Sequence, residues 1–102
     1  MALKVINGVK YYPVSESMMF NLESCHDKYS VMIYEAQDKG DTARVEELEK
    51  LRDESDELCG KASCGRYLSG KDYGRAKEFV AWRICMRDQA CAAAGVPNLY
   101  DR

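Results

Sequence analysis

The sequence predicts a mostly α (α+β) fold, in which an N-terminal β-hairpin is followed by three helices and the first two helices form an antiparallel helical hairpin. Three observations lead to this prediction. Asn7-Gly8 separates two short apolar runs, apolar residues recur at helical spacing from residue 15 onward, and Gly40 and Gly95 follow the first and last helical patterns. With 102 residues, 46% hydrophobic and 31% charged, the chain fits one folded domain, residues 1–102.

Residues 1–14 are predicted to form the β-hairpin. Runs of β-forming residues at 3–6 and 9–12 flank Asn7-Gly8, a pair that suits a type I′ turn because both central residues need positive φ. Ile6 should then pair with Val9, and Pro13, which cannot donate a ladder hydrogen bond, should end the second strand. A two-stranded hairpin alone is marginally stable, so we expect it to lie against the helices or to pair with another chain.

Residues 15–39 are predicted to form the first helix, with Ser15 or Ser17 as its N-cap. Its apolar positions alternate by four and three residues, and such a seam must be covered by another helix. A second apolar strip, Phe20, Val31 and Tyr34, lies roughly opposite. A helix that is apolar on two sides is central to its domain or lies at an oligomer interface, and the hairpin is a candidate cover for the second strip. The seam comprises Met18, Leu22, Cys25, Tyr29, Met32 and Ala36.

The second helix is predicted at 41–63 and the third at 72–94. Asp41 or Thr42 should cap the second helix, whose thin apolar stripe is interrupted by a serine. Ser69 and Asp72 have the spacing of a capping box, and Gly95 should end the third helix. We expect a loop at 64–71 and a tail at 96–102 with Leu99 and Tyr100 on the surface. The stripe of the second helix comprises Leu48, Leu51, Ser55, Leu58 and Ala62.

The net charge of −2 conceals an uneven distribution of charge along the chain. Residues 35–57 carry ten acidic and four basic residues, whereas residues 61–87 carry seven basic and two acidic residues. One interpretation is that an acidic second helix packs beside a basic third helix. The other is that one of these patches faces a partner of opposite charge.

Basic residues interleaved with aromatic residues near the third helix form a candidate site for nucleic acid or a phosphate-bearing nucleotide. The alternative is that Arg83 and Arg87 pair with acids of the second helix or with Glu35. The acidic composition of the whole chain argues against nucleic acid. Residues 65–72 nearly match a phosphate-binding loop, but Asp72 replaces the required hydroxyl, so we interpret the match as chance. The candidate anion-binding residues are Arg66, Lys71, Arg75, Arg83 and Arg87.

The five cysteines are interpreted as buried thiols, and no metal ion or other cofactor is predicted. Cys85 and Cys91 lie six residues apart on a predicted helix, which points them about 120° apart. Cys25 and His26 are adjacent on a helix and point about 100° apart, so they do not form a nucleophilic pair. No complete catalytic constellation is present, and we therefore expect the protein not to be an enzyme.

No apolar run approaches the roughly 18 residues of a membrane span, and no apolar signal region follows Met1. We therefore expect a cytoplasmic protein that does not bind membranes. Small size and the lack of catalytic motifs favour a protein that binds other proteins, such as the accessory and inhibitory proteins of phages and mobile elements. We expect two kinds of partner. One is a second copy of this chain, in a homodimer or higher oligomer, and the other is an unidentified protein.

The expected interface residues are Phe20, Val31, Tyr34 and Tyr11, or the edge of the hairpin. Two alternatives to protein binding stay open. One is a binder of RNA, DNA or a nucleotide that uses the arginine-rich face of the third helix. The other is a zinc-stabilised interaction module.

Overall fold

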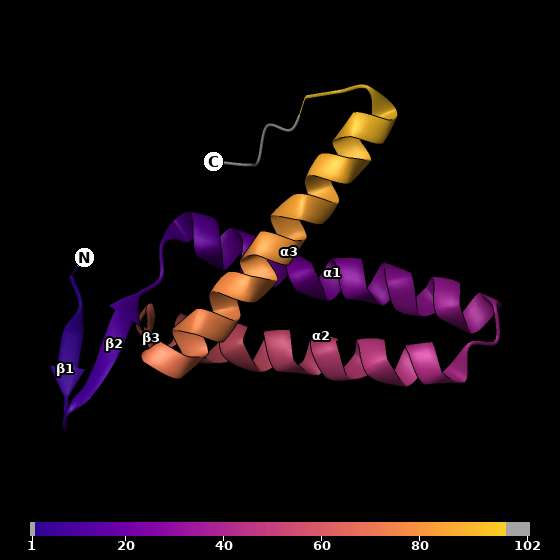
Figure 1. The fold of residues 1–102 in the computed structure, drawn as a ribbon. Coiled ribbons are helices and arrows are strands. Elements are labelled where there is room, and N and C mark those ends of the chain that lie inside the picture. Colours follow the sequence, from indigo (N-terminus) through magenta and orange to yellow (C-terminus); the bar gives the residue numbers. More distant parts are fainter. Residues whose placement is uncertain (1, 98–102) are drawn as a thin grey trace.

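The computed structural model describes residues 2–97 and confirms the predicted fold class (Figure 1). Leu99 and Tyr100, which we placed in a C-terminal tail, lie outside the described residues. The elements in chain order are β1 (Lys4–Ile6), β2 (Val9–Pro13), α1 (Glu16–Asp38), α2 (Thr42–Ser63), β3 (Tyr67–Ser69) and α3 (Gly70–Ala94).

The N-terminal hairpin has the predicted turn and the predicted register. Asn7 and Gly8 have φ angles of 52° and 77°, as a type I′ turn requires, and Ile6 pairs with Val9. β2 ends at Pro13, as expected for a residue that cannot donate to the ladder. The local sequence therefore determines the turn and the register of this hairpin.

The third strand was not predicted, because we expected residues 64–71 to form a loop. β3 pairs antiparallel with β2, so β2 is the central strand of a sheet with the order β1-β2-β3. The backbone N–H of Val14 donates to the carbonyl oxygen of Arg66 at 2.8 Å, which extends this pairing. A three-residue strand between Gly65 and Gly70 is too short to show a strand period. β3 gives the hairpin the third strand that it needs for stability.

The sheet lies against the start of α3. Tyr12 stacks on Tyr73, with the ring centroids 5.1 Å apart, and Leu68 of β3 is buried. The suggestion that the hairpin covers the second apolar strip of the first helix is therefore wrong. The residues of that strip, Phe20, Val31 and Tyr34, are 46%, 49% and 70% exposed.

α1 begins as predicted, because the Ser15 Oγ accepts a hydrogen bond from the backbone N–H of Met18 at 3.2 Å. Most of the predicted seam is buried, but Met18 and Met32 are only half-buried, and Met19 and Ile33 are buried instead. The buried stripe is wider than a two-helix seam because α3 as well as α2 packs on α1. The buried apolar residues of α1 are Met19, Leu22, Cys25, Tyr29, Ile33 and Ala36.

α2 runs antiparallel to α1 and begins at Asp41, whose carboxylate accepts a hydrogen bond from the backbone N–H of Arg44 at 3.1 Å. Its predicted stripe is confirmed, with Leu51 half-buried and the other members buried. Ser55 is fully buried, and its hydroxyl donates to the carbonyl oxygen of Arg52 at 2.9 Å. The serine therefore interrupts the apolar stripe without leaving its own hydroxyl unpaired.

α3 begins at Gly70, two residues before the predicted start, and Ser69 makes no side-chain capping bond. The predicted capping box does not form, and the carboxylate of Asp72 accepts a hydrogen bond from Lys61 of α2 instead. At the other end, Gly95 has a φ of 71° and ends the helix in the left-handed conformation, as predicted.

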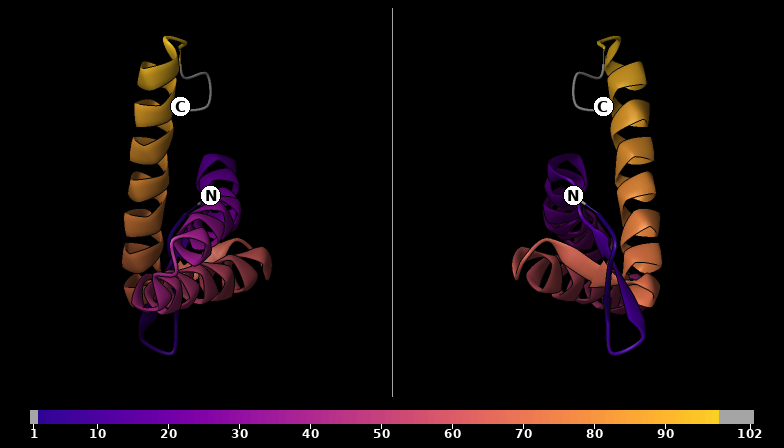
Figure 2. Two further views of the ribbon diagram at one scale, coloured as in Figure 1. Left: turned by 90° about the vertical axis from the view of Figure 1, so that its right-hand side faces the viewer. Right: turned by 90° about the vertical axis from the view of Figure 1, so that its left-hand side faces the viewer.

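α3 crosses the α1–α2 pair obliquely, and its C-terminal half extends beyond α1 (Figures 1 and 2). The molecule measures 48 × 33 × 17 Å, and its radius of gyration of 15.4 Å exceeds the roughly 13 Å of a compact chain of this length. None of the helices in residues 2–97 has the length and apolarity that a membrane-spanning segment needs.

The burial pattern predicts that a substitution in the core lowers the free energy of unfolding far more than a substitution at an exposed position. Leu22→Ala removes a side chain that is 1% exposed and should lower the free energy of unfolding by about 2–5 kcal/mol. Glu46→Ala, at an exposed position of α2, should change it by less than about 0.5 kcal/mol. Urea unfolding followed by circular dichroism measures both. Equal effects would contradict the assignment of Leu22 to the core.

Candidate functional site

The first candidate surface is the part of the hairpin that extends away from the helices (Figure 1). Four aliphatic side chains there are between 44% and 62% exposed, although residues of this kind are usually buried. Side chains of neighbouring strand residues point to opposite faces, so the hairpin exposes apolar groups on both of its faces. We call the following residues the hairpin surface: Leu3, Lys4, Val5, Ile6, Val9 and Lys10.

Contacts to β3 hold this surface in place. The ammonium group of Lys4 lies 4.3 Å from the ring centroid of Tyr67, and the Tyr67 hydroxyl donates to the carbonyl oxygen of Ala2 at 2.8 Å. β1 is an edge strand of the sheet that the described residues form. Because Ile6 and Val9 close the turn, the backbone N–H and C=O of Val5 point outward from this edge. The hairpin surface therefore offers backbone hydrogen bonds as well as apolar side chains.

The second candidate surface is the side of α1 that faces away from α2 and α3. Asp27, Val31, Tyr34 and Asp38 follow one another by four, three and four residues, so they line one face of the helix, and all four are exposed. We call these four residues the α1 outer face. Tyr34 borders a shallow hollow of about 200 Å³ between α1 and α2.

Two of the predicted interface residues lie apart from the α1 outer face. Phe20 is on the same side of the helix but nearer α3, and the guanidinium of Arg87 lies 5.4 Å from its ring centroid. Tyr11 is half-buried on β2, where it pairs with Lys4 on one side and Ser69 on the other. The structure therefore does not gather the four predicted residues into one patch.

As the alternative to anion binding, we considered that Arg83 and Arg87 pair with acids of the second helix or with Glu35. The structure instead directs both arginines at oxygen atoms of α1. Arg87 is only 8% exposed, and its Nη1 donates to the Oδ1 of Asn21 at 2.7 Å. Its Nη2 donates to the Ser24 hydroxyl at 3.4 Å, and the Nε of Arg83 donates to the Ser24 carbonyl oxygen at 3.3 Å. Burial, together with the neighbouring Arg87 charge, lowers the pKa of Arg83.

Asn21 is the residue that sequence reasoning missed in this cluster. It is 1% exposed, and its own Nδ2 donates to the carbonyl oxygen of Ser17 at 2.9 Å. The signal in the sequence is Arg87 itself, because at helical spacing it lies on the same side of α3 as the apolar residues Ala76 and Val80. A buried arginine requires oxygen acceptors, but only the crossing of α1 and α3 identifies which oxygens these are.

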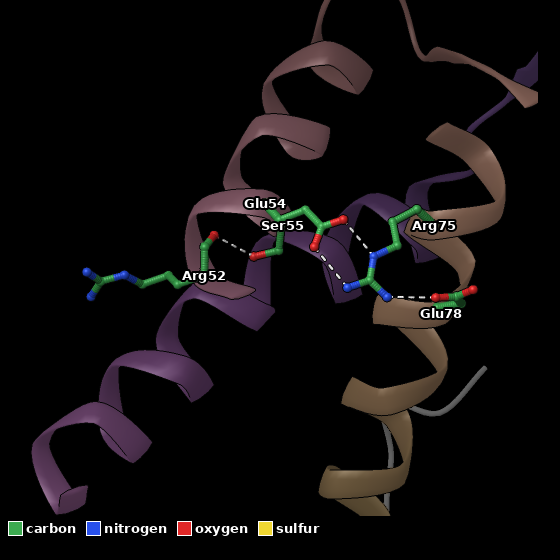
Figure 3. A network of polar contacts seen from close by, with 5 residues as sticks. All are labelled: Arg52, Glu54, Ser55, Arg75 and Glu78. Carbon is green, nitrogen blue, oxygen red and sulfur yellow. Dashed lines mark hydrogen bonds and ion pairs between the residues drawn. The ribbon is translucent and has the colours of Figure 1, made fainter. Parts of the chain in front are cut away.

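Arg75 is the centre of a second polar network, which joins α2 to α3 (Figure 3). Its Nε and Nη2 donate to the two carboxylate oxygens of Glu54 at 2.7 and 2.9 Å, and its Nη1 donates to Glu78 at 2.7 Å. These hydrogen bonds raise the pKa of Arg75, and the bond from Arg75 lowers the pKa of Glu54. The planar guanidinium is suited to such a two-point contact with a carboxylate. Arg75 is therefore committed to carboxylates of its own chain.

The remaining two anion-binding candidates lie apart from the buried arginines. Arg66 has a φ of 64° and lies half-buried before β3, where its backbone N–H donates to the Ala62 carbonyl oxygen at 2.8 Å. Lys71 is exposed in the first turn of α3. Residues 65–72 form β3 and the start of α3, and a helix rather than a buried strand precedes them. The interpretation of the phosphate-loop match as chance agrees with this arrangement.

A cleft of about 550 Å³ separates the C-terminal half of α2 from the first turns of α3. Lys61 lines it and contacts Asp72 at 3.2 Å and Glu57 at 3.5 Å. The hydrogen bond to Asp72 is the main reason why the pKa of Lys61 is raised. Arg75 lines the same cleft with its own carboxylate partners. The ion pairs of this cleft join the two helices, and within each pair the opposite charges offset each other.

The thiols lie in different environments. Cys25 is fully buried between α1 and α3, its Sγ donates to the Phe79 carbonyl oxygen at 3.6 Å, and burial raises its pKa to about 12. Burial also raises the pKa of Cys59. Because only the thiolate is a good nucleophile, Cys25 is unreactive at neutral pH. Contrary to our interpretation of all five as buried, Cys64 and Cys85 are exposed.

The Nδ1 of His26 lies 3.0 Å from the Oδ2 of Asp56, so this side chain joins α1 to α2 at the surface. Within residues 2–97, no three His, Cys, Asp or Glu side chains are grouped in a way that could hold a metal ion. The described side chains thus offer no zinc site of the kind that the zinc-stabilised alternative requires.

No protein-family model, no curated protein and no solved structure matches this chain.

The Glu54–Arg75 contact predicts a dependence of stability on pH. The pKa of Glu54 is lower in the folded than in the unfolded chain, so the contact stabilises the fold above the unfolded pKa of 4.5, and this stabilisation is lost as pH falls through the folded pKa. Both side chains are partly exposed to solvent, which limits the effect to less than about 1 kcal/mol. Glu54→Gln should therefore destabilise the protein more at pH 7 than at pH 3. Urea titrations at both pH values test this, and an equal difference at both would contradict it.

The buried cluster predicts that Arg87 is a structural residue. Arg87→Ala leaves the Asn21 Oδ1 without this donor and should lower the free energy of unfolding by about 2 kcal/mol. Lys77→Ala, at an exposed position of the same helix, should change it by less than about 0.5 kcal/mol. Thermal and urea unfolding of both variants measure this. An Arg87→Ala protein of unchanged stability would return Arg87 to the candidates for anion binding.

Proposed function

We propose that this protein is non-catalytic and acts by binding protein chains through the hairpin surface and the α1 outer face. The observation that carries the proposal is the exposure of Leu3, Val5, Ile6 and Val9 within one short hairpin. Clustered exposed apolar side chains are typical of sites where proteins contact one another. The outward-pointing backbone of β1 adds a means of binding an extended partner segment.

The positions of the arginines support protein binding over phosphate binding. Arg83 and Arg87 are directed at oxygen atoms of α1, and Arg75 is held by two carboxylates. An anion would have to displace these internal partners before it could bind the guanidinium groups of Arg75 and Arg87. Protein contact through the hairpin surface requires no such rearrangement.

The thiols and acids support a role without catalysis. The pKa of about 12 keeps Cys25 protonated at neutral pH, so it is a poor nucleophile. Glu54 and Glu78 are occupied by Arg75, and the pKa of Glu54 is lowered, which is the opposite of what a general acid needs. These side chains serve the packing of the helices.

We further propose an accessory or inhibitory role in the cytoplasm, such as small proteins of phages and mobile elements fulfil. All five cysteines are free thiols, which suits a reducing compartment. A protein with this role would bring its two exposed surfaces to a larger partner and alter what that partner does.

Site-specific photo-crosslinking tests the proposed function. A photoreactive amino acid is placed at Val5, at Tyr34 or, as the control, at the exposed Lys50 of α2, and the protein is irradiated in cells of its natural source. We expect ultraviolet-dependent protein adducts from Val5 and Tyr34 but not from Lys50. Adducts of equal yield from all three positions, or from none of them, would contradict the proposal. Mass spectrometry of the adducts identifies the bound chain.

A further inference from the structure

The hairpin surface and the α1 outer face carry opposite charges. Residues 2–14 contain two lysines, Lys4 and Lys10, and no acidic residue. The α1 outer face contains Asp27 and Asp38, and the exposed Glu23 lies one turn before Asp27. One surface is therefore apolar and cationic, and the other is apolar and anionic.

The two surfaces also match in their apolar side chains. The hairpin offers aliphatic groups that are 44–62% exposed, and the α1 outer face offers Val31 and Tyr34, which are 49% and 70% exposed. The hollow beside Tyr34 is about 200 Å³ in volume, and Ile33 lines it together with polar and charged side chains of both helices. Apolar contact would stabilise the complex while lysine–aspartate pairs set the orientation of the two surfaces.

The two surfaces are too far apart to meet within one chain. β3 and the start of α3 hold the hairpin at the end of the molecule where α1 begins (Figure 1). Val31 lies about 22 Å from the start of α1 along the helix axis, because a helix rises about 1.5 Å per residue. The complement of the hairpin surface must therefore come from another molecule.

We propose that the hairpin surface of one copy of this chain docks on the α1 outer face of a second copy. This inference rests on the proposed function and names the partner of its two surfaces. Contact between like surfaces is disfavoured, since two hairpin surfaces bring four lysines together and two α1 outer faces bring four aspartates together. Contact between unlike surfaces pairs these charges, and two copies that dock reciprocally make the same contact twice.

Charge reversal provides the test. One variant carries Lys4→Glu and Lys10→Glu, a second carries Asp27→Lys and Asp38→Lys, and the control carries Lys50→Glu and Lys77→Glu at exposed positions outside both surfaces. Circular dichroism confirms the folding of each protein. Sedimentation velocity then measures self-association at low salt, over a range of protein concentrations.

We expect the wild type and the control to self-associate and each of the other two variants to do so at least about tenfold more weakly, because like charges now face each other. Mixing these two variants in equal amounts should restore association between them, because both contacts of a mixed pair again join opposite charges. A monomeric wild type, unchanged association of either variant, or a mixture that stays monomeric would overturn the proposal.

The photo-crosslinking experiment separates this inference from the proposed function. If the wild type is monomeric but Val5 and Tyr34 crosslink to a different protein, the second copy is excluded and protein binding stands. If the wild type is monomeric and neither position crosslinks, both proposals fail. Adducts between two copies of this chain, formed at Val5 and at Tyr34, support both.

Discussion

The structure depends on the burial of α1 against two other helices at once. α2 and α3 each pack on α1 but contact each other far less, so α1 is the central helix of the molecule. Tyr29 illustrates this position, since its ring stacks on Trp82 of α3, with the centroids 4.3 Å apart, although the residue belongs to the stripe buried along α2. With α1 buried on two sides, its third side is left to solvent, and that side carries the α1 outer face.

Polar contacts determine where α3 packs on the α1–α2 pair. Arg87 donates to Asn21 of α1, and Arg75, nearer the start of α3, bridges to Glu54 of α2 (Figure 3). Apolar packing alone would allow α3 to slide, because dispersion contacts have little directional preference. Hydrogen bonds from buried or partly buried arginines restrict the position of α3 far more. A guanidinium without acceptors is costly to bury, so only helix positions that keep these bonds are stable. The arginines that suggested a phosphate site in the sequence are better understood as fixing the helix crossing.

The features that were predictable from the sequence are those with a local cause. The Asn7-Gly8 turn and the Gly95 stop depend on a few neighbouring residues and were found as predicted, and each N-cap, Ser15 and Asp41, is one of the two candidates that the sequence offered. β3 was missed because its three residues become a strand only by pairing with β2. The α1 outer face was partly predictable, since Val31 and Tyr34 lie opposite the seam. The exposure of Val5, Ile6 and Val9 was not, because the local sequence does not show that the turn end of the hairpin extends away from the helices.

The burial of Cys25 has a consequence for measuring the motions of this fold. Its thiol lies between α1 and α3, whereas Cys64 and Cys85 are exposed and Cys59 and Cys91 are half-buried. A thiol-reactive dye can reach Cys25 only when α3 separates from α1, so its labelling rate reports how often this opening occurs. The labelling rate of Cys25 therefore measures how fast the α1–α3 contact opens. In a variant in which the other four cysteines are replaced by serine or alanine, this single thiol would time the opening of the core.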